Sequence, residues 1–303
     1  MRFKRTAAAA ASAFLLGGAA VASAGPATAA TASTTTATGA TAACRLWLGS
    51  VTSGGDLANT DVTAGSPITA KRSTGPHLFP AGSAKVMSTW TETIGIAGEA
   101  SWYGDAILNS TLYHGAYGID STGKPFTSVK AAGGGYNGYK AIDDTFYGGR
   151  TVRGASYKLR GDGVLYRYDA DHKLSSRYTG YSAVKTMTLI SETATYDTFL
   201  ANTYGGALYT IHVPANIKQA PIVKKVRTST WQGFEYLVAE KCGTQSTLLA
   251  AVDKDSGSAY LYAVGHANGA ATVIRGLGKI PGSFKDSVYF LNTAEGNPPL
   301  FGE

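Results

Sequence analysis

The segment Gly138-Tyr139-Lys140-Ala141-Ile142 is one of five copies of a short pattern in the chain. Each copy starts with a glycine, and successive glycines lie 56, 42, 53 and 49 residues apart. A Leu-Tyr dipeptide falls between the copies. A repeat of about 50 residues, rich in glycine and β-forming side chains, is typical of a β-propeller. The other copies are Gly82-Ser83-Ala84-Lys85-Val86, Gly180-Tyr181-Ser182-Ala183-Val184, Gly233-Phe234-Glu235-Tyr236-Leu237 and Gly282-Ser283-Phe284-Lys285-Asp286.

One unit, residues 138–179, contains four short strand patterns in succession. The first, 139–147, is mostly apolar and ends at a Gly-Gly pair. The second, 155–159, alternates and is followed by Gly161-Asp162-Gly163, which predicts a hairpin turn. Residues 164–168 and 175–178 give two more strands. Four antiparallel strands in about 40 residues are typical of one propeller blade.

The two ends of the chain predict how the ring closes. After Gly282 only one strand pattern remains, and residues 45–51 and 56–62 read as later strands of a blade that lacks its first. We therefore expect an all-β, five-bladed β-propeller of four-stranded antiparallel blades. Pairing the C-terminal strand with the N-terminal half-blade would remove the exposed sheet edges. Helical folds are disfavoured, because 38 glycines and the missing 3.6-residue period argue against them.

The first 43 residues are expected to lie outside this ring. Residues 1–29 combine three basic side chains, an apolar run and small-residue cleavage sites between Ala24 and Ala29, which is typical of a secretory signal peptide. A membrane anchor is the weaker interpretation, because the apolar run is short and broken by two glycines. Residues 30–43, rich in Ala and Thr, predict a linker, and 44–303 the propeller. The sequence thus predicts a secreted, extracellular protein.

Cys44 and Cys242 are the only cysteines. In an exported chain two cysteines usually pair. The blade assignment places both at the seam where the ring closes, so we predict a disulfide there. Neither cysteine has the spacing of a metal ligand or a catalytic thiol.

The charge of the chain excludes some partners. The net charge is +7, and removing Arg2, Lys4 and Arg5 lowers it to +4. The remaining basic residues are scattered, so nucleic acid is not expected as a partner. No stretch beyond residues 1–29 is apolar for long enough to predict a membrane span.

The sequence offers few enzymatic signals. The five histidines show no metal-ligand spacing, and no nucleophile elbow, phosphate loop or zinc motif occurs, so no catalytic residue, metal or cofactor is predicted. Two alternatives stay open. One is a glycosidase with a carboxylate pair near the axis, and the other is a propeller that docks proteins. Adjacent Asp143 and Asp144 would point to opposite faces, with one of them solvated. The acids on the innermost strands are Asp143, Asp144, Glu235, Glu240 and Asp286.

Sugar binding is the better-supported function. Aromatic rings stack on sugars, and Asp or Asn side chains bond hydroxyl groups. The chain has 18 tyrosines and 4 tryptophans, several beside predicted turns. The aromatic residues before the repeat glycines, Tyr136, Tyr178 and Trp231, are instead expected to pack between blades. The predicted ligand-binding residues are Trp102, Tyr103, Asp105, Tyr147, Asp162, Tyr204, Asp253 and Asp255.

The unit of glycine, aromatic, apolar position, Asp/Gly turn and Leu-Tyr resembles the repeats of tachylectin-like lectins. That resemblance implies a five-bladed propeller that binds N-acetylated amino sugars. The first and last copies depart from it, with Ser83 and Ser283 in place of the aromatic residue. The alanine-rich export signal is similar to those of actinobacterial proteins. Small secreted propeller lectins are the surface-recognising subunits of umbrella toxin particles in Streptomyces. Similarity to those subunits implies other subunits of a secreted complex as partners.

Overall fold

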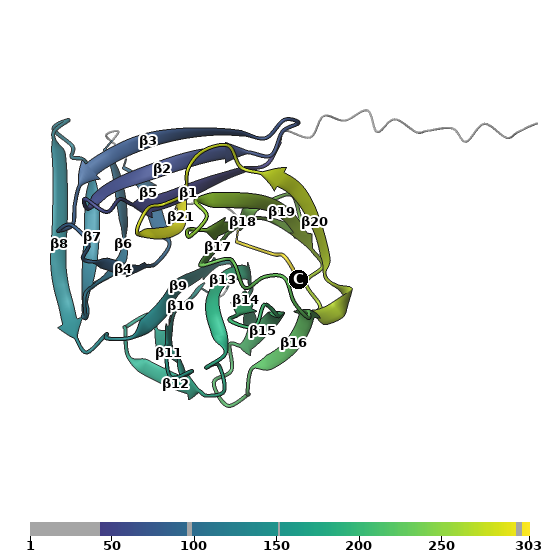
Figure 1. Ribbon diagram of the computed structural model, residues 1–303. Coiled ribbons are helices and arrows are strands. Elements are labelled where there is room, and N and C mark those ends of the chain that lie inside the picture. Colours follow the sequence, from purple (N-terminus) through teal and green to yellow (C-terminus); the bar gives the residue numbers. More distant parts are fainter. Residues whose placement is uncertain (1–42, 96–98, 151, 295–298) are drawn as a thin grey trace, which may run out of the picture. The chain divides into compact units, whose positions relative to one another are not determined.

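The computed structural model describes residues 43–95, 99–150, 152–294 and 299–303, and this part is built from β-strands (Figure 1). It contains strands β1 to β21 and one short 3-10 turn, η1 (Gly269–Ala271), and no α-helix occurs in these residues. None of their helical segments is long and apolar enough to cross a membrane. The predicted signal peptide and linker lie outside the described residues. An all-β fold was predicted and is confirmed.

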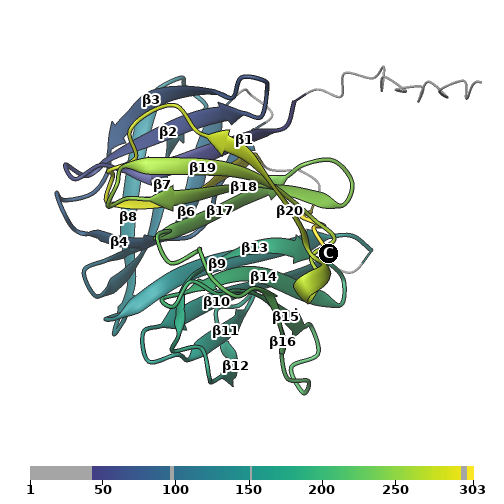
Figure 2. The ribbon, with the colours of Figure 1, turned by 45° about the vertical axis from the view of Figure 1, so that its right-hand side comes forward.

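Three four-stranded antiparallel sheets follow one another along the chain (Figures 1 and 2). In each sheet, consecutive strands pair through short turns, as the repeat predicted. The strands are β9 (Tyr139–Gly148), β10 (Val152–Arg160), β11 (Leu165–Asp169) and β12 (Leu174–Tyr178); β13 (Val184–Glu192), β14 (Tyr196–Thr203), β15 (Leu208–Pro214) and β16 (Ile222–Arg227); and β17 (Tyr236–Lys241), β18 (Ser246–Asp253), β19 (Ser258–Gly265) and β20 (Val273–Lys279).

A fourth, nine-stranded sheet joins the two ends of the described chain. The C-terminal strand β21 pairs antiparallel with β1, which is the predicted closure. It also pairs in parallel with β5 through Asn292 and Trp90, so two expected blades share one sheet. The strand expected to follow Gly82, the first strand of the second of these blades, is broken at Ser88-Thr89 into β4 and β5. Its second part, β5, pairs with β21. The strands are β1 (Arg45–Val51), β2 (Asp56–Thr63), β3 (Thr69–His77), β4 (Ala84–Met87), β5 (Trp90–Ile94), β6 (Ala100–Leu108), β7 (Thr111–Ile119), β8 (Pro125–Gly134) and β21 (Val288–Ala294).

The first strands of the repeats contact one another in a closed cycle. β4 contacts β9, then β13, β17 and β21 follow in turn, and β21 contacts β4 again. In Figure 1 these strands lie toward the middle, and β3, β8, β12, β16 and β20 lie at the periphery. β9 and β13 run in the same direction. Near their starts Lys140 Nζ donates to Val184 O (2.6 Å), and near their ends Phe146 N donates to Glu192 Oε2 (2.8 Å).

Apolar side chains between neighbouring sheets form the core. The predicted packing role of the aromatic residues before the repeat glycines is confirmed. Trp231 is buried among residues of β14, β15, β17 and β18, Tyr178 packs against residues of β10, β13 and β14, and Tyr136 packs between β4, β7 and β9. These contacts tie each sheet to the next and hold the first strands around the middle.

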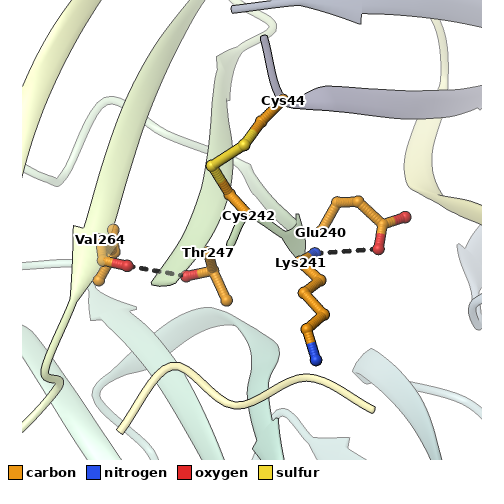
Figure 3. The surroundings of a disulfide bond; sticks show 6 residues. All are labelled: Cys44, Glu240, Lys241, Cys242, Thr247 and Val264. Atoms are coloured by element: carbon orange, nitrogen blue, oxygen red, sulfur yellow. Dashed lines mark hydrogen bonds between the residues drawn. A yellow bond between two sulfur atoms is a disulfide. The ribbon is translucent and has the colours of Figure 1, made fainter. Parts of the chain in front are cut away.

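The predicted disulfide is confirmed. Cys44 precedes β1 and Cys242 follows β17, and their sulfur atoms are bonded with Cα atoms 5.5 Å apart (Figure 3). The bond joins positions 198 residues apart in the sequence. Glu240 and Lys241 directly precede Cys242, so the bond also fixes the end of β17 from which these side chains project.

Candidate functional site

The first candidate site is a pocket of about 300 Å³ between β1–β3 and β5–β7, called the Trp102 pocket below. Four aromatic side chains line it, and five polar side chains accompany them. The aromatic residues are Trp47, Trp102, Tyr117 and Phe290, and the polar residues are Asn59, Ser73, Thr74, Glu92 and Asn292.

Strand register builds one wall of the Trp102 pocket. Glu92 of β5 is paired with Trp102 of β6, and Trp102 with Tyr117 of β7. Directly paired residues point to the same face of a sheet, so the three side chains form one row. The Trp102 and Tyr117 rings stack with centroids 5.2 Å apart and planes 9° apart. The pocket therefore has a flat aromatic surface with a carboxylate beside it.

The opposite wall comes from the two ends of the chain. Trp47 of β1 is paired with Asn292 of β21, and Asn292 Nδ2 donates to Asn59 Oδ1 on β2 at 3.0 Å. This bond orients both amides and leaves each with further hydrogen-bonding capacity. Burial, and next the charge of Glu92, raise the pKa of Tyr117 to about 12, so its phenol stays a neutral donor.

Trp90 forms the base beneath these aromatic rings. It is buried, and its ring centroid lies 5.9 Å from that of Tyr117 and 6.1 Å from that of Phe290. Gly104 and Gly115 make room for the indole, because a Cβ atom would lie 2.4 Å from Trp90 at the first position and 2.6 Å at the second. The two glycines let Trp90 support the pocket from below.

Trp102 is the only predicted ligand-binding residue in this pocket. The segment 102–105 was predicted to lie beside a turn, which is wrong, because it lies in the middle of β6. Alternation sends Tyr103 to the other face, where it is exposed. Asp105 is buried and bonded to His114 Nδ1 at 2.7 Å, so its carboxylate is engaged.

The remaining predicted residues lie on other sheets. Tyr147 is near the end of β9. Asp162, in the β10–β11 turn, is ion-paired with Arg160. Tyr204 is exposed in the β14–β15 turn, and Lys140 Nζ lies over its ring, 5.1 Å from the ring centroid. Asp253 accepts a bond from Ser256 N at 2.9 Å, and Asp255 is exposed in the same turn. They do not converge on one site.

The second candidate site is a cavity of about 350 Å³ surrounded by β4, β9, β13, β17 and β21, called the central cavity below. Of the predicted acids, Asp143, Asp144 and Glu240 line it. Glu235 is instead ion-paired with Lys185 at 2.6 Å, and Asp286 with Arg72 at 2.7 Å. Glu192 also lines the cavity and was not predicted.

The four carboxylates of the central cavity have raised pKa values. Burial is the main cause for each, and it raises the pKa of Glu192 to about 7. Asp143 accepts a bond from Leu189 N and Asp144 from the Ser156 and Ser88 hydroxyls, so the two point to opposite sides as predicted. Asp143 is buried, whereas Asp144 is partly exposed, so the expectation that one of them is solvated is met in part.

Sequence reasoning missed most of the Trp102 pocket. The sequence contains a signal for the position of Tyr117, because a hairpin with a two-residue turn at Asn109-Ser110 pairs Tyr117 with Trp102. The predicted pairing of the chain ends brings together the strands of Trp47 and Asn292, but the sequence contains no signal for the register that pairs these two residues. In the described residues no group of three or more His, Cys, Asp or Glu side chains is placed to hold a metal ion. The sequence matches no protein-family model, and no curated protein is significantly similar to it.

Proposed function

We propose that this protein is an exported, non-catalytic glycan-binding protein, built as a five-bladed β-propeller, and that it binds sugar in the Trp102 pocket. The observation that carries the proposal is the row of Glu92, Trp102 and Tyr117 facing Asn59 and Asn292 across one pocket. An aromatic face buries the apolar side of a sugar ring, while amides and a carboxylate bond its hydroxyl groups.

The five-bladed ring is supported by the cycle of contacts. Five first strands contact one another in order, and three further strands follow outward from each when β21, β1, β2 and β3 are counted as one blade. The remaining half of the nine-stranded sheet then forms a blade of β6, β7 and β8 around a first strand divided into β4 and β5. The closed arrangement leaves β21 paired on both sides.

Export is supported by the predicted signal peptide and by the disulfide, since such bonds persist in oxidising compartments. The ligand we favour is a glycan with an N-acetylated amino sugar, which rests on the resemblance of the repeats. The asparagine amides of the Trp102 pocket fit an acetamido group, which has one donor and one acceptor. The proposed role within a larger secreted complex, as the subunit that targets cell surfaces, rests on the export signal and the resemblance alone.

The test is a glycan array probed with the full chain, purified with its disulfide intact. We expect binding to glycans with N-acetylated amino sugars and no change in the bound glycans over hours. A parallel assay measures sugar released into solution. Release would favour the glycosidase alternative, and neither binding nor release would favour protein docking. Either result would overturn the proposal.

A further inference from the structure

The outermost strands of the sheets carry charged residues of one sign. These strands, β3, β8, β12, β16 and β20, lie at the periphery in Figure 1. Each contains Lys or Arg and none contains Asp or Glu, although the chain has 20 acidic residues. Charged side chains protect edge strands against pairing with other chains, but charges of either sign serve that purpose. Edge protection alone therefore does not explain why all these charges are positive.

The basic residues are densest on two neighbouring outer strands, β16 and β20. The parts of the chain that contain these strands, residues 198–234 and 256–285, have no acidic residue. The basic residues are scattered along the sequence, but the fold gathers five of them on this pair of strands (Figure 1). The surface formed by these five residues is called the β16–β20 face below. They are Lys224, Lys225, Arg227, Arg275 and Lys279.

The segment around η1 joins the two strands into one surface. η1 contacts β16 and lies just before β20 in the sequence. Lys224 Nζ donates to Asn268 Oδ1 at 2.7 Å, and Arg227 Nη2 donates to Thr272 O at 3.1 Å. Both bonds cross from β16 to the segment that leads into β20. They hold two cationic side chains in place without neutralising them, because amide and carbonyl oxygens carry no net charge.

Acidic side chains do not neutralise this face. In the part of the chain that the structure describes, none of its five basic residues forms an ion pair. Glu303 contacts the same sheet as β16, but its carboxylate is bonded to Thr198 Oγ1 at 2.8 Å and His212 Nδ1 at 3.1 Å. All five basic residues except Arg227 are exposed. Their positive charges are therefore available to an anionic partner.

The spacing of the cations fits a polymer better than a small anion. Arg275 and Lys279 are four positions apart on β20, and four steps along an extended strand span about 13 Å. A small anion contacts only one of these groups, whereas a chain with an anionic group on each repeat contacts several. Every phosphate or comparable anionic group that is neutralised releases a counterion, which favours binding.

The side chains of this face favour a polymer other than nucleic acid. Three of the five are lysines, which act as point charges. Arg227, which could form a bidentate contact with a base, donates instead to the carbonyl oxygens of Val226 and Thr272. An exported protein also meets anionic polysaccharides outside the cell.

We infer that the β16–β20 face binds an anionic polysaccharide. The lysine and arginine side chains pair with the anionic groups of successive sugar units, and the bonds to Asn268 and Thr272 keep two of these side chains in position. The choice of a polysaccharide rests on the export that is part of the proposed function. The face itself does not depend on sugar binding in the Trp102 pocket, because β16 and β20 contribute no residue to that pocket.

The test is fluorescence anisotropy of a labelled heparin oligosaccharide titrated with the full, oxidised chain at pH 7.5 and 100 mM salt. We expect saturable binding that weakens as salt rises, with a log–log slope of roughly −2 to −4. Lys224→Gln/Lys225→Gln should bind at least fivefold more weakly, and so should Arg275→Gln/Lys279→Gln. Both pairs lie mainly at exposed positions, so the variants should fold, which circular dichroism verifies.

The matched control is Lys124→Gln/Lys130→Gln. It removes the same charge from exposed positions of the β7–β8 hairpin, which lies on the other side of Figure 1 from β16 and β20. Heparin binding by this variant should weaken less than twofold. Trp102→Ala should bind heparin as the wild type does, so the outcome is separate from that of the glycan array.

Three results would overturn the inference. One is no heparin binding by the wild type. A second is equal weakening by Lys124→Gln/Lys130→Gln, which would mean general attraction by net charge. The third is tighter binding to a DNA duplex, or to vesicles that contain phosphatidylglycerol, than to heparin, because the partner would then be a nucleic acid or a membrane. Each of these results leaves sugar binding by the Trp102 pocket standing.

Discussion

The indole ring of Trp102 lies flat on the phenol ring of Tyr117, with centroids 5.2 Å apart and planes 9° apart. The two residues are directly paired on β6 and β7, so the backbone register itself produces the stack. A preformed aromatic surface lowers the ordering cost of binding, because neither ring has to be immobilised by the ligand.

The stack should be measurable as a coupling energy. A double-mutant cycle with Trp102→Ala and Tyr117→Ala, followed by urea denaturation, is expected to give a coupling of about 0.5–1.5 kcal/mol in the free energy of unfolding. The same cycle on Trp102 and Tyr204, which lie on different sheets, serves as the control and should give a coupling near zero. Strictly additive effects of Trp102→Ala and Tyr117→Ala would contradict the stacked arrangement.

Trp231→Ala should affect stability and leave sugar binding unchanged. Trp231 is 5% exposed and contacts Phe234 and Tyr262 at centroid distances of 5.5 and 5.0 Å. Truncating such a buried aromatic side chain costs about 3–5 kcal/mol. Chemical denaturation measures the loss, and glycan binding at a temperature where the variant is folded serves as the control. A loss below about 1 kcal/mol would mean that this side chain does not hold neighbouring sheets together.

The disulfide should contribute to stability through the long loop that it closes. Cys44 and Cys242 are 198 residues apart, and the chain-entropy model gives an upper value of about 5 kcal/mol for a loop of this size. The double variant Cys44→Ser/Cys242→Ser should lower the urea midpoint, and mass spectrometry of non-reduced digests should find one linked peptide. Two free thiols in the native protein would contradict the seam between β1 and β17.

Glu192 should make stability fall as the pH rises. Burial raises the pKa of Glu192 to about 7 from 4.5. Between these values the unfolded chain has released a proton that the folded chain still holds, so the unfolding free energy declines as pH increases through this window. The facing charged groups are Asp143 of β9, Arg153 of β10 and Asp197 of β14.

This pH dependence of the unfolding free energy is tested by comparing wild type with Glu192→Gln. From pH 4.5 to pH 8 the wild type should lose on the order of 3 kcal/mol more than this variant, whose side chain does not titrate. Asp255→Asn should keep the wild-type dependence. Identical pH profiles for wild type and Glu192→Gln would show that the carboxyl group is not buried as described.

The repeat predicted local strands well, because glycine turns and alternating side chains are local signals. The unit 138–179 became β9 to β12 with the expected turn at Gly161-Asp162-Gly163. The parallel pairing of β21 with β5 could not be predicted. It depends on the break at Ser88-Thr89 and joins Asn292 to Trp90, which are far apart in the sequence.

The sites were predicted only in part, because they depend on contacts between sheets. Trp102 was identified as a sugar-stacking residue, but its partners Trp47 and Asn292 come from opposite ends of the chain. Glu192 is the last residue of β13 and lies beside a polar turn, where the sequence suggests solvent. The tail at Leu300 and the edge of β9 cover it, and neither contact is visible in the local pattern.

The most direct test of the account is calorimetric titration of the best array glycan into wild type, Trp102→Ala and Tyr103→Ala. Trp102 and Tyr103 are neighbours on β6 that face opposite sides of the sheet, so the two variants are matched in position and chemistry. We predict at least tenfold weaker binding for Trp102→Ala, since a lost stacking surface costs more than about 1.4 kcal/mol, and unchanged binding for Tyr103→Ala. Unchanged affinity in Trp102→Ala, with loss in Tyr103→Ala, would place the sugar in the central cavity and contradict the account.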